Sequence, residues 1–185
     1  LKQLIRKKKI PFEMVAGTVI FRKRDLHNWA SMRIMSIETK ALENYHEQAQ
    51  NHPGVLTKNE IYLSHFVTPK LMVHSFNAKT KNSVIKELSK IAENQYFISD
   101  QKKVYELLLE REELGSTGLK NGIAIPHTQI HSDYLFLDSF LIVAISSAGI
   151  PFGSFDGRLT DLFFMPCAQS DQSHLYMLAR LMMMI

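Results

Sequence analysis

The chain has 185 residues, of which 45% are hydrophobic and 22% are charged, and its net charge is +4 at pH 7. This composition is typical of a folded globular protein, and the length allows one medium domain or a domain of about 120 residues with a smaller piece. The single cysteine, Cys167, excludes an internal disulfide, and the sequence has no apolar run of about 18 residues and no signal peptide. We therefore expect a cytoplasmic protein without a membrane span.

The charge is unevenly distributed along the chain. Residues 1–33, the basic segment, carry a net charge of +7, and residues 34–185 carry −3. This asymmetry predicts an anionic partner for the basic segment and protein or small-molecule partners for the rest. Because the chain begins with Leu1 and ends inside an apolar helical pattern, we expect sequence to be missing at both ends, including the C-terminus of the second domain.

The basic segment predicts a helix, a hairpin and a second helix. Residues 1–9 show helical spacing and a basic end, and Pro11 follows the helix. Two short β-prone runs on either side of Ala16-Gly17 give a weak hairpin signal. Residues 24–35 then have the pattern of an amphipathic helix that contains Trp29.

Residues 36–65 are polar and predict a linker, and a second domain follows from residue 66 to residue 185. Its first long helix is expected at about 79–94, and Asp100 has the position of an N-cap for a helix at 101–113. Near-continuous apolar runs at 122–126, 139–145 and 162–165 predict buried strands, before helical spacing returns at 173–184. This mixture indicates the α/β class, with helices packed against a sheet.

The stretch from Arg111 to His127 reads R-E-E-L-G-S-T-G-L-K-N-G-I-A-I-P-H. Its three glycines and Asn121 allow backbone amides to approach an anion closely. The buried strand after them would carry His127 to its exposed end, where neutral imidazole is a nucleophile able to form a labile phosphoramidate. The stretch therefore predicts a phosphoryl-acceptor site.

This stretch strongly resembles the signature R-E-x-L-x-S-T-G-x-G-N-G-I-A-I-P-H of enzyme IIA domains of the bacterial phosphotransferase system (PTS), in the fructose, mannitol and nitrogen-regulatory class. The resemblance extends over residues 66–185 and includes a second motif around His174. It implies a mixed-sheet α/β sandwich and phosphorylation of His127 by the phosphocarrier HPr or a paralogue. It also implies that His174 supports the acceptor, that Arg111 binds the phosphate, and that no metal or other cofactor takes part. The phosphate loop would comprise Ser116, Thr117, Gly118 and Asn121, with the two hydroxyls as donors.

The sequence departs from the family pattern at three positions. Lys120 replaces a glycine, and Thr128 and Gln129 replace a small residue and an arginine that often follow the histidine. The first change adds a cation, whereas the second removes a positive charge near the phosphate. The sequence therefore does not establish whether phosphoryl transfer is efficient.

The basic segment resembles the latter part of a small excisionase-like or MerR-like winged helix-turn-helix domain, through its helix, Ile-Pro, strand pair and D-L-x-x-W pattern. The resemblance implies a partial DNA-binding unit at residues 1–35. The alternative is a solvated basic face. The residues implied to contact DNA phosphates are Arg6, Lys7, Lys8, Arg22 and Lys23.

Three functions remain open from the sequence. The leading hypothesis is a regulatory phosphoryl carrier that couples its phosphorylation state to DNA binding or to a target protein. The second is a sugar-specific IIA component that passes the phosphoryl group to a IIB domain, and the third is an unphosphorylated interaction module. The sequence also leaves open whether the chain acts as an enzyme. It does not identify the sugar or target protein, the DNA operator or the oligomeric state.

Some titratable side chains have no predicted partner. His27, His74 and His131 are expected at the surface, and Glu112 is expected to be a solvated carboxylate.

Overall fold

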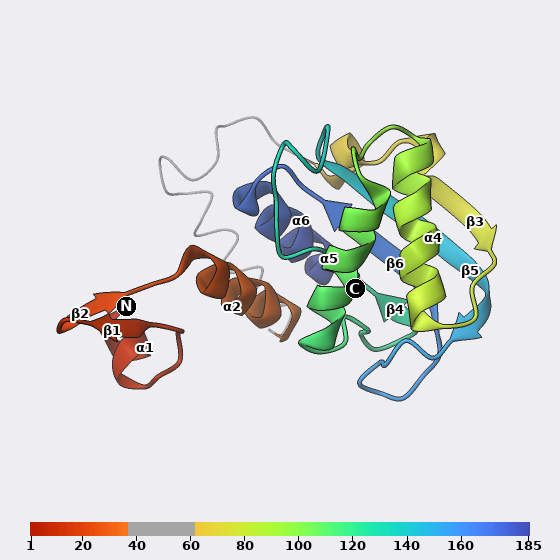
Figure 1. Ribbon diagram of the computed structural model, residues 1–185. Helices are drawn as coiled ribbons and strands as arrows, with labels where there is room; N and C mark the ends of the chain where they lie inside the picture. Colours follow the sequence, from red (N-terminus) through yellow and green to blue (C-terminus); the bar gives the residue numbers. More distant parts are fainter. Residues whose placement is uncertain (37–61) are drawn as a thin grey trace. The chain divides into compact units, whose positions relative to one another are not determined.

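A computed structural model describes residues 1–36 and 62–185 (Figure 1). The chain divides into two compact units, one formed by Glu60–His174 and the other by Leu1–Asn59 with Leu175–Ile185. Most of the predicted linker, residues 37–61, lies outside the described residues. Among the residues that are described, no helix is both long enough and apolar enough to cross a membrane.

The larger unit contains a four-stranded sheet with the order β3-β5-β6-β4. Its strands are β3 (Met72–Phe76), β4 (Ile123–Ala124), β5 (Phe140–Ile150) and β6 (Thr160–Cys167). The β5–β6 pair is antiparallel, and β3 and β4 lie parallel to their neighbours, so the sheet is mixed, as predicted.

Strand β3 is absent from the strands predicted from the sequence. This edge strand has the sequence M-V-H-S-F, which lacks the continuous apolar run that revealed the other strands. Its pairing with β5 shifts register between His74 and Phe76, and Ser75 between them has a φ of 59°. An irregular edge strand of this kind gives little periodic signal.

Two helices of the larger unit, α4 (Lys81–Asn94) and α5 (Gln101–Glu113), pack against each other and lie side by side in front of the sheet in Figure 1. Both begin at a side-chain cap. The Thr80 hydroxyl accepts a hydrogen bond from Ser83 N at 3.2 Å, and Asp100 Oδ1 accepts one from Lys103 N at 2.9 Å. The predicted cap at Asp100 is thus confirmed, as are both helices.

Short helices η1 (Leu63–Phe66) and η2 (Pro69–Leu71) precede β3, and α6 (Asp171–Met184) closes the chain. The core between the sheet and the helices is aromatic and aliphatic. Phe163 of β6 meets Phe76 and Phe152 edge to face, at centroid distances of 5.6 and 5.3 Å. Cys167 is fully buried in this core, and its burial raises the pKa of the thiol.

The described part of the other unit begins with α1 (Lys2–Arg6), β1 (Glu13–Val15), β2 (Thr18–Ile20) and α2 (Lys23–Ser36), so the predicted order of helix, hairpin and helix is confirmed. Ala16 and Gly17 have φ values of 48° and 78°, which fits the two positive φ angles of a type I′ hairpin turn. Trp29 Nε1 donates to Lys9 O at 2.7 Å and so links α2 to the segment that follows α1.

Candidate functional site

The loop after α5 doubles back along β4 and positions His127. Ile125 N donates to Thr117 O at 3.0 Å, and Gly118 pairs with Ala124 as an antiparallel bridge. Asn121 and Gly122 make the turn between the two segments, with φ values of 61° and 76°. The predicted strand at 122–126 is therefore short, and His127 follows its last residue by three positions. The expected exposed position of His127 is wrong, because the residue is 1% exposed.

The hydrogen bonds of the His127 ring define its tautomer. Nδ1 lies 2.8 Å from Ile125 O, and a carbonyl oxygen can only accept, so Nδ1 carries the hydrogen. Nε2 lies 3.1 Å from Arg111 Nε, which can only donate, so Nε2 presents a lone pair. The nucleophilic atom of this imidazole is therefore Nε2, and the side chain is 1% exposed.

Arg111 lies in the last turn of α5, and its guanidinium is directed at Nε2 of His127. Besides the bond to His127, its Nη1 donates to Gly115 O at 3.0 Å. Burial lowers the pKa of the guanidinium, and the adjacent Glu112 carboxylate opposes that shift. Because an arginine keeps its charge even when buried, the site holds a fixed cation against Nε2.

Glu112 is not the solvated carboxylate that was expected. Its side chain is 5% exposed and forms an ion pair with Lys81, in which Nζ and Oε1 are 2.8 Å apart. Oε2 accepts from the Thr117 hydroxyl at 2.6 Å, and Oε1 accepts from Thr117 N at 3.0 Å. The Glu112 carboxylate therefore accepts the hydrogen bond that the loop amide was expected to offer to a bound anion.

The residues of the predicted phosphate loop make hydrogen bonds within the protein. Both hydroxyls that were expected as phosphate donors are engaged within the protein, because Thr117 donates to Glu112 and Ser116 Oγ donates to Phe152 O at 3.0 Å. Gly118 N donates to Ser116 Oγ at 3.1 Å, and Asn121 N donates to Asp156 Oδ2 at 3.1 Å. In this structure the loop is held by its own contacts.

Lys81, the first residue of α4, was missed by the sequence analysis. Its Nζ lies 3.4 Å from Ser116 Oγ and 5.0 Å from the centroid of the Phe152 ring, in addition to its ion pair with Glu112. The lysine lies 31 positions before Glu112, and no local pattern links two residues so far apart. Only the packing of α4 beside α5 brings them together.

The second histidine of the resemblance lies beside the first. The rings of His127 and His174 have centroids 4.9 Å apart and planes inclined by 39°, and His174 is fully buried in the first turn of α6. The structure therefore brings together Arg111, His127 and His174, the three residues named for the phosphoryl chemistry.

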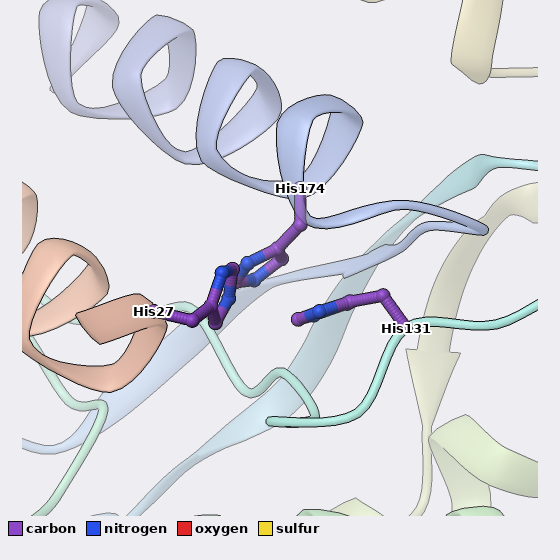
Figure 2. A group of neighbouring side chains, drawn as sticks. All are labelled: His27, His131 and His174. Carbon is purple, nitrogen blue, oxygen red and sulfur yellow. The ribbon is translucent and has the colours of Figure 1, made fainter. Parts of the chain in front are cut away.

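A third imidazole, that of His131, stacks on His174. Figure 2 shows the two side chains side by side, and their centroids are 4.1 Å apart with planes inclined by 22°. The His131 side chain is 0% exposed, so its expected surface position is wrong. Its Nδ1 lies 3.0 Å from Asp171 Oδ1.

The other two histidines expected at the surface differ from each other. His27, the third histidine labelled in Figure 2, belongs to the other unit and is buried, so its expected position is wrong. His74 is exposed, as expected.

The residues that depart from the family pattern fall into two environments. Lys120 is exposed at the turn before β4, where an added cation meets no steric obstacle. Thr128 and Gln129 are buried directly after His127, and the Thr128 hydroxyl donates to Ile130 O at 2.9 Å. These two side chains therefore contribute to the packing around the acceptor and add no charge to it.

The candidate DNA-contacting residues of the basic segment lie on the surface of their unit. Arg6, Lys7, Lys8 and Lys23 are exposed. Arg22 pairs with Glu13 across the hairpin base at 3.0 Å, with 65% of its own side chain still exposed.

Comparisons with known proteins agree with this fold. Residues 65–185 match the family described as phosphoenolpyruvate-dependent sugar phosphotransferase system, EIIA 2. A nitrogen regulatory protein of Klebsiella oxytoca is 31% identical over 121 residues, which are 64% of this chain and 73% of that protein.

Two solved structures share the fold. The nitrogen regulatory protein IIA-Ntr from Neisseria meningitidis superposes with a TM-score of 0.58 at 24% identity, over 65% of this chain and 81% of that one. Enzyme IIA for mannitol from Escherichia coli, in its complex with phosphorylated enzyme IIB, superposes with a TM-score of 0.52 at 19% identity, over 60% of this chain and 74% of that one. The fold and site thus define a IIA-type domain with a mixed sheet. The chain belongs to the EIIA type 2 family of the phosphotransferase system.

Proposed function

We propose that this chain is a cytoplasmic phosphoryl carrier of the nitrogen-regulatory IIA type, in which His127 accepts a phosphoryl group from HPr or a paralogue. One observation carries the assignment to His127. Its Nδ1 hydrogen is held by Ile125 O, while its Nε2 lone pair faces the buried guanidinium of Arg111. The resemblance to nitrogen regulatory proteins favours a regulatory role over sugar uptake.

The transfer balances without moving a proton. The hydrogen bond from Arg111 Nε to Nε2 breaks first. The Nε2 lone pair then attacks the phosphorus of the donor, a nitrogen–phosphorus bond forms, and the bond between phosphorus and the leaving atom breaks with its electron pair staying on the donor. The phosphorylated ring keeps its Nδ1 hydrogen, and its positive charge is supported by Ile125 O. Because the His127 side chain is 1% exposed, the ring must be uncovered when the donor docks.

Arg111 and His174 would act on the phosphoryl oxygens. Arg111 Nε donates to the lone pair of the reacting nitrogen, so the guanidinium must turn aside as the nitrogen–phosphorus bond forms and can then donate to the phosphoryl oxygens. His174 lies beside the same ring and can donate a hydrogen bond to an oxygen on Nε2 once it is protonated or suitably oriented.

Labelling tests the acceptor. The full chain is incubated with enzyme I, HPr and radiolabelled phosphoenolpyruvate, and His127→Gln is compared with His74→Gln, which changes an exposed histidine on β3. We expect label on the wild type and the His74 variant and none on the His127 variant. Equal labelling of both variants would reject His127, and no label on any protein would leave only an unphosphorylated interaction module.

A second candidate function is a sugar-specific IIA component that donates to a IIB domain. The likeness in fold to the IIA of a mannitol IIA–IIB complex supports it. Adding a purified IIB domain to the labelled chain distinguishes the two roles. Label that moves to IIB would favour the sugar-specific role, and label that stays on His127 would favour the regulatory one.

We further propose that residues 1–35 form part of a winged helix-turn-helix that binds DNA. The support is the order of helix, hairpin and helix, and the exposed side chains of Arg6, Lys7, Lys8 and Lys23. Binding of the full chain to duplex DNA is measured against salt. Phosphate contacts by these four residues and Arg22, five in all, predict an affinity loss of roughly 500-fold between 50 and 200 mM salt. A flat response would contradict this proposal and leave the phosphoryl chemistry untouched.

A further inference from the structure

His131 and Asp171 form a pair next to the acceptor site that the transfer chemistry described above does not use. The two residues are 40 positions apart in the sequence, yet Nδ1 and Oδ1 are 3.0 Å apart. The imidazole is 0% exposed and the carboxylate 27%, so the pair extends from the interior towards solvent. A buried ring paired with a carboxylate at its Nδ1 has a fixed plane, because rotation about its axis would break the bond.

The fixed plane of His131 supports His174. The two rings are nearly parallel, at 22°, and their centroid distance of 4.1 Å is that of direct stacking. On its other side His174 approaches His127 at 4.9 Å with a larger inclination of 39°. His174 therefore contacts one ring that a carboxylate holds in place and another that accepts the phosphoryl group.

The positions of Asp171 and His131 in the chain allow both residues to support His174. Asp171 is the first residue of α6 and His174 lies three positions later, so the carboxylate and the supported ring belong to the same helical turn. His131 lies in the loop after His127, four positions further along the sequence. The stack thus links the acceptor loop to the start of α6 through side chains alone.

We propose that His131 and Asp171 are positioning residues for His174: Asp171 fixes the His131 ring, and that ring holds His174 at the orientation in which it can bond the phosphoryl group on His127. This inference rests on the proposed function of His127. Misplacing a supporting group by about 1 Å can reduce a rate by about 10²-fold. The pair therefore affects the transfer step without touching the phosphoryl group.

Three variants of the full chain test the stack. His131→Leu removes the flat ring, His131→Phe keeps a flat ring without the bond to Asp171, and Asp171→Asn keeps an acceptor without its charge. His74→Gln serves as the matched control on an exposed histidine. Two measurements are made: the ¹⁵N ring signals of His174 in the unphosphorylated protein, and kcat and KM for phosphorylation by HPr.

We expect His131→Leu to shift the His174 ring signals and to lower kcat by about tenfold or more, with KM for HPr unchanged, because the docking surface is not altered. His131→Phe, which keeps the ring but loses the bond that fixes it, is expected to recover only part of the loss, and Asp171→Asn, which keeps the ring and weakens that bond, to lose less than His131→Phe. The His74 control leaves every value at that of the wild type.

Other results would overturn the inference. Wild-type His174 signals and kcat in His131→Leu, with only a lower melting temperature, would show that His131 is structural. If His131→Leu does not fold, wild-type His174 signals in both other variants would reject the role. If the wild type takes no label, the proposed function fails, and the His174 signals, which need no phosphorylation, still decide whether His131 and Asp171 position that ring.

Discussion

The proposed acceptor, His127, lies between two supports that are built in different ways. On one side Arg111 and Glu112, adjacent residues at the end of α5, hold the acceptor nitrogen and the loop before it. On the other side His131 and His174 form a stack assembled from a loop and a distant helix. The first support comes from one contiguous motif, whereas the second exists only once the chain has folded.

The two supports differ in what they supply: one supplies a charged group, and the other supplies polar rings in a particular orientation. The Arg111 side supplies a buried cation and a loop fixed by an ion pair. The side of the stacked rings supplies polar groups whose effect depends on how their planes lie. Substitutions at Arg111 should therefore reduce phosphorylation more than substitutions in the His131–His174 stack.

Replacing the buried guanidinium has the largest expected effect. Arg111→Lys keeps the charge but loses the planar fork that bonds His127 and Gly115 together, so we expect the rate of phosphorylation to fall by about 100-fold. Arg158→Lys, at an arginine whose side chain is 71% exposed, is the control. Steady-state labelling by HPr measures both variants, and similar rates for the two would remove Arg111 from the site.

Loss of the Glu112 charge tests the loop. Glu112→Gln breaks the ion pair to Lys81 and weakens the bonds to Thr117, so we expect the free energy of unfolding to fall by about 2 kcal/mol. Glu113→Gln, at the exposed neighbour, should stay within about 0.5 kcal/mol of the wild type. Urea unfolding of both variants gives the comparison. Equal midpoints would mean that the carboxylate does not hold the loop.

The supporting imidazole comes next. His174→Gln removes the ring that stacks on His131, but a side-chain donor remains near the acceptor, so we expect the phosphorylation rate to fall by about tenfold. Single-turnover labelling separates this loss from weaker docking. A larger fall than that of Arg111→Lys would reverse the ranking of the two sides.

The smallest effect concerns the turn before β4. Hydrogen bonds from Asn121 N and Arg158 N lower the pKa of the Asp156 carboxyl, so its contribution to stability is present above the ordinary carboxyl pKa and is lost as pH falls through the lowered value. The stability difference between the wild type and Asp156→Asn should therefore shrink as the pH falls below about 4. Urea unfolding at several pH values measures it, with Asp133→Asn, an exposed carboxyl, as control. A difference independent of pH would exclude the proposed cause.

The sequence predicts the first support far better than the second. The motif from Arg111 to His127 is contiguous, and apolar runs reveal β5 and β6, so the mixed α/β domain and the site residues Arg111 and His127 could be named in advance. The role of Glu112 could not, because its partner Lys81 lies on another helix. The position of His131 also depends on tertiary packing, since its partner Asp171 begins α6. Pair contacts between distant segments leave no periodic signal in a single sequence.

The proposed function depends above all on Nε2 of His127 as the phosphoryl acceptor. NMR of the ¹⁵N-labelled chain after phosphorylation by enzyme I and HPr tests it directly, through the coupling of phosphorus to a ring nitrogen. The hydrogen bonds of the ring predict one phosphorus coupled to Nε2 of His127, with Nδ1 still carrying its hydrogen to Ile125 O. Phosphorus coupled to Nδ1, or to a nitrogen of another histidine, would contradict the account.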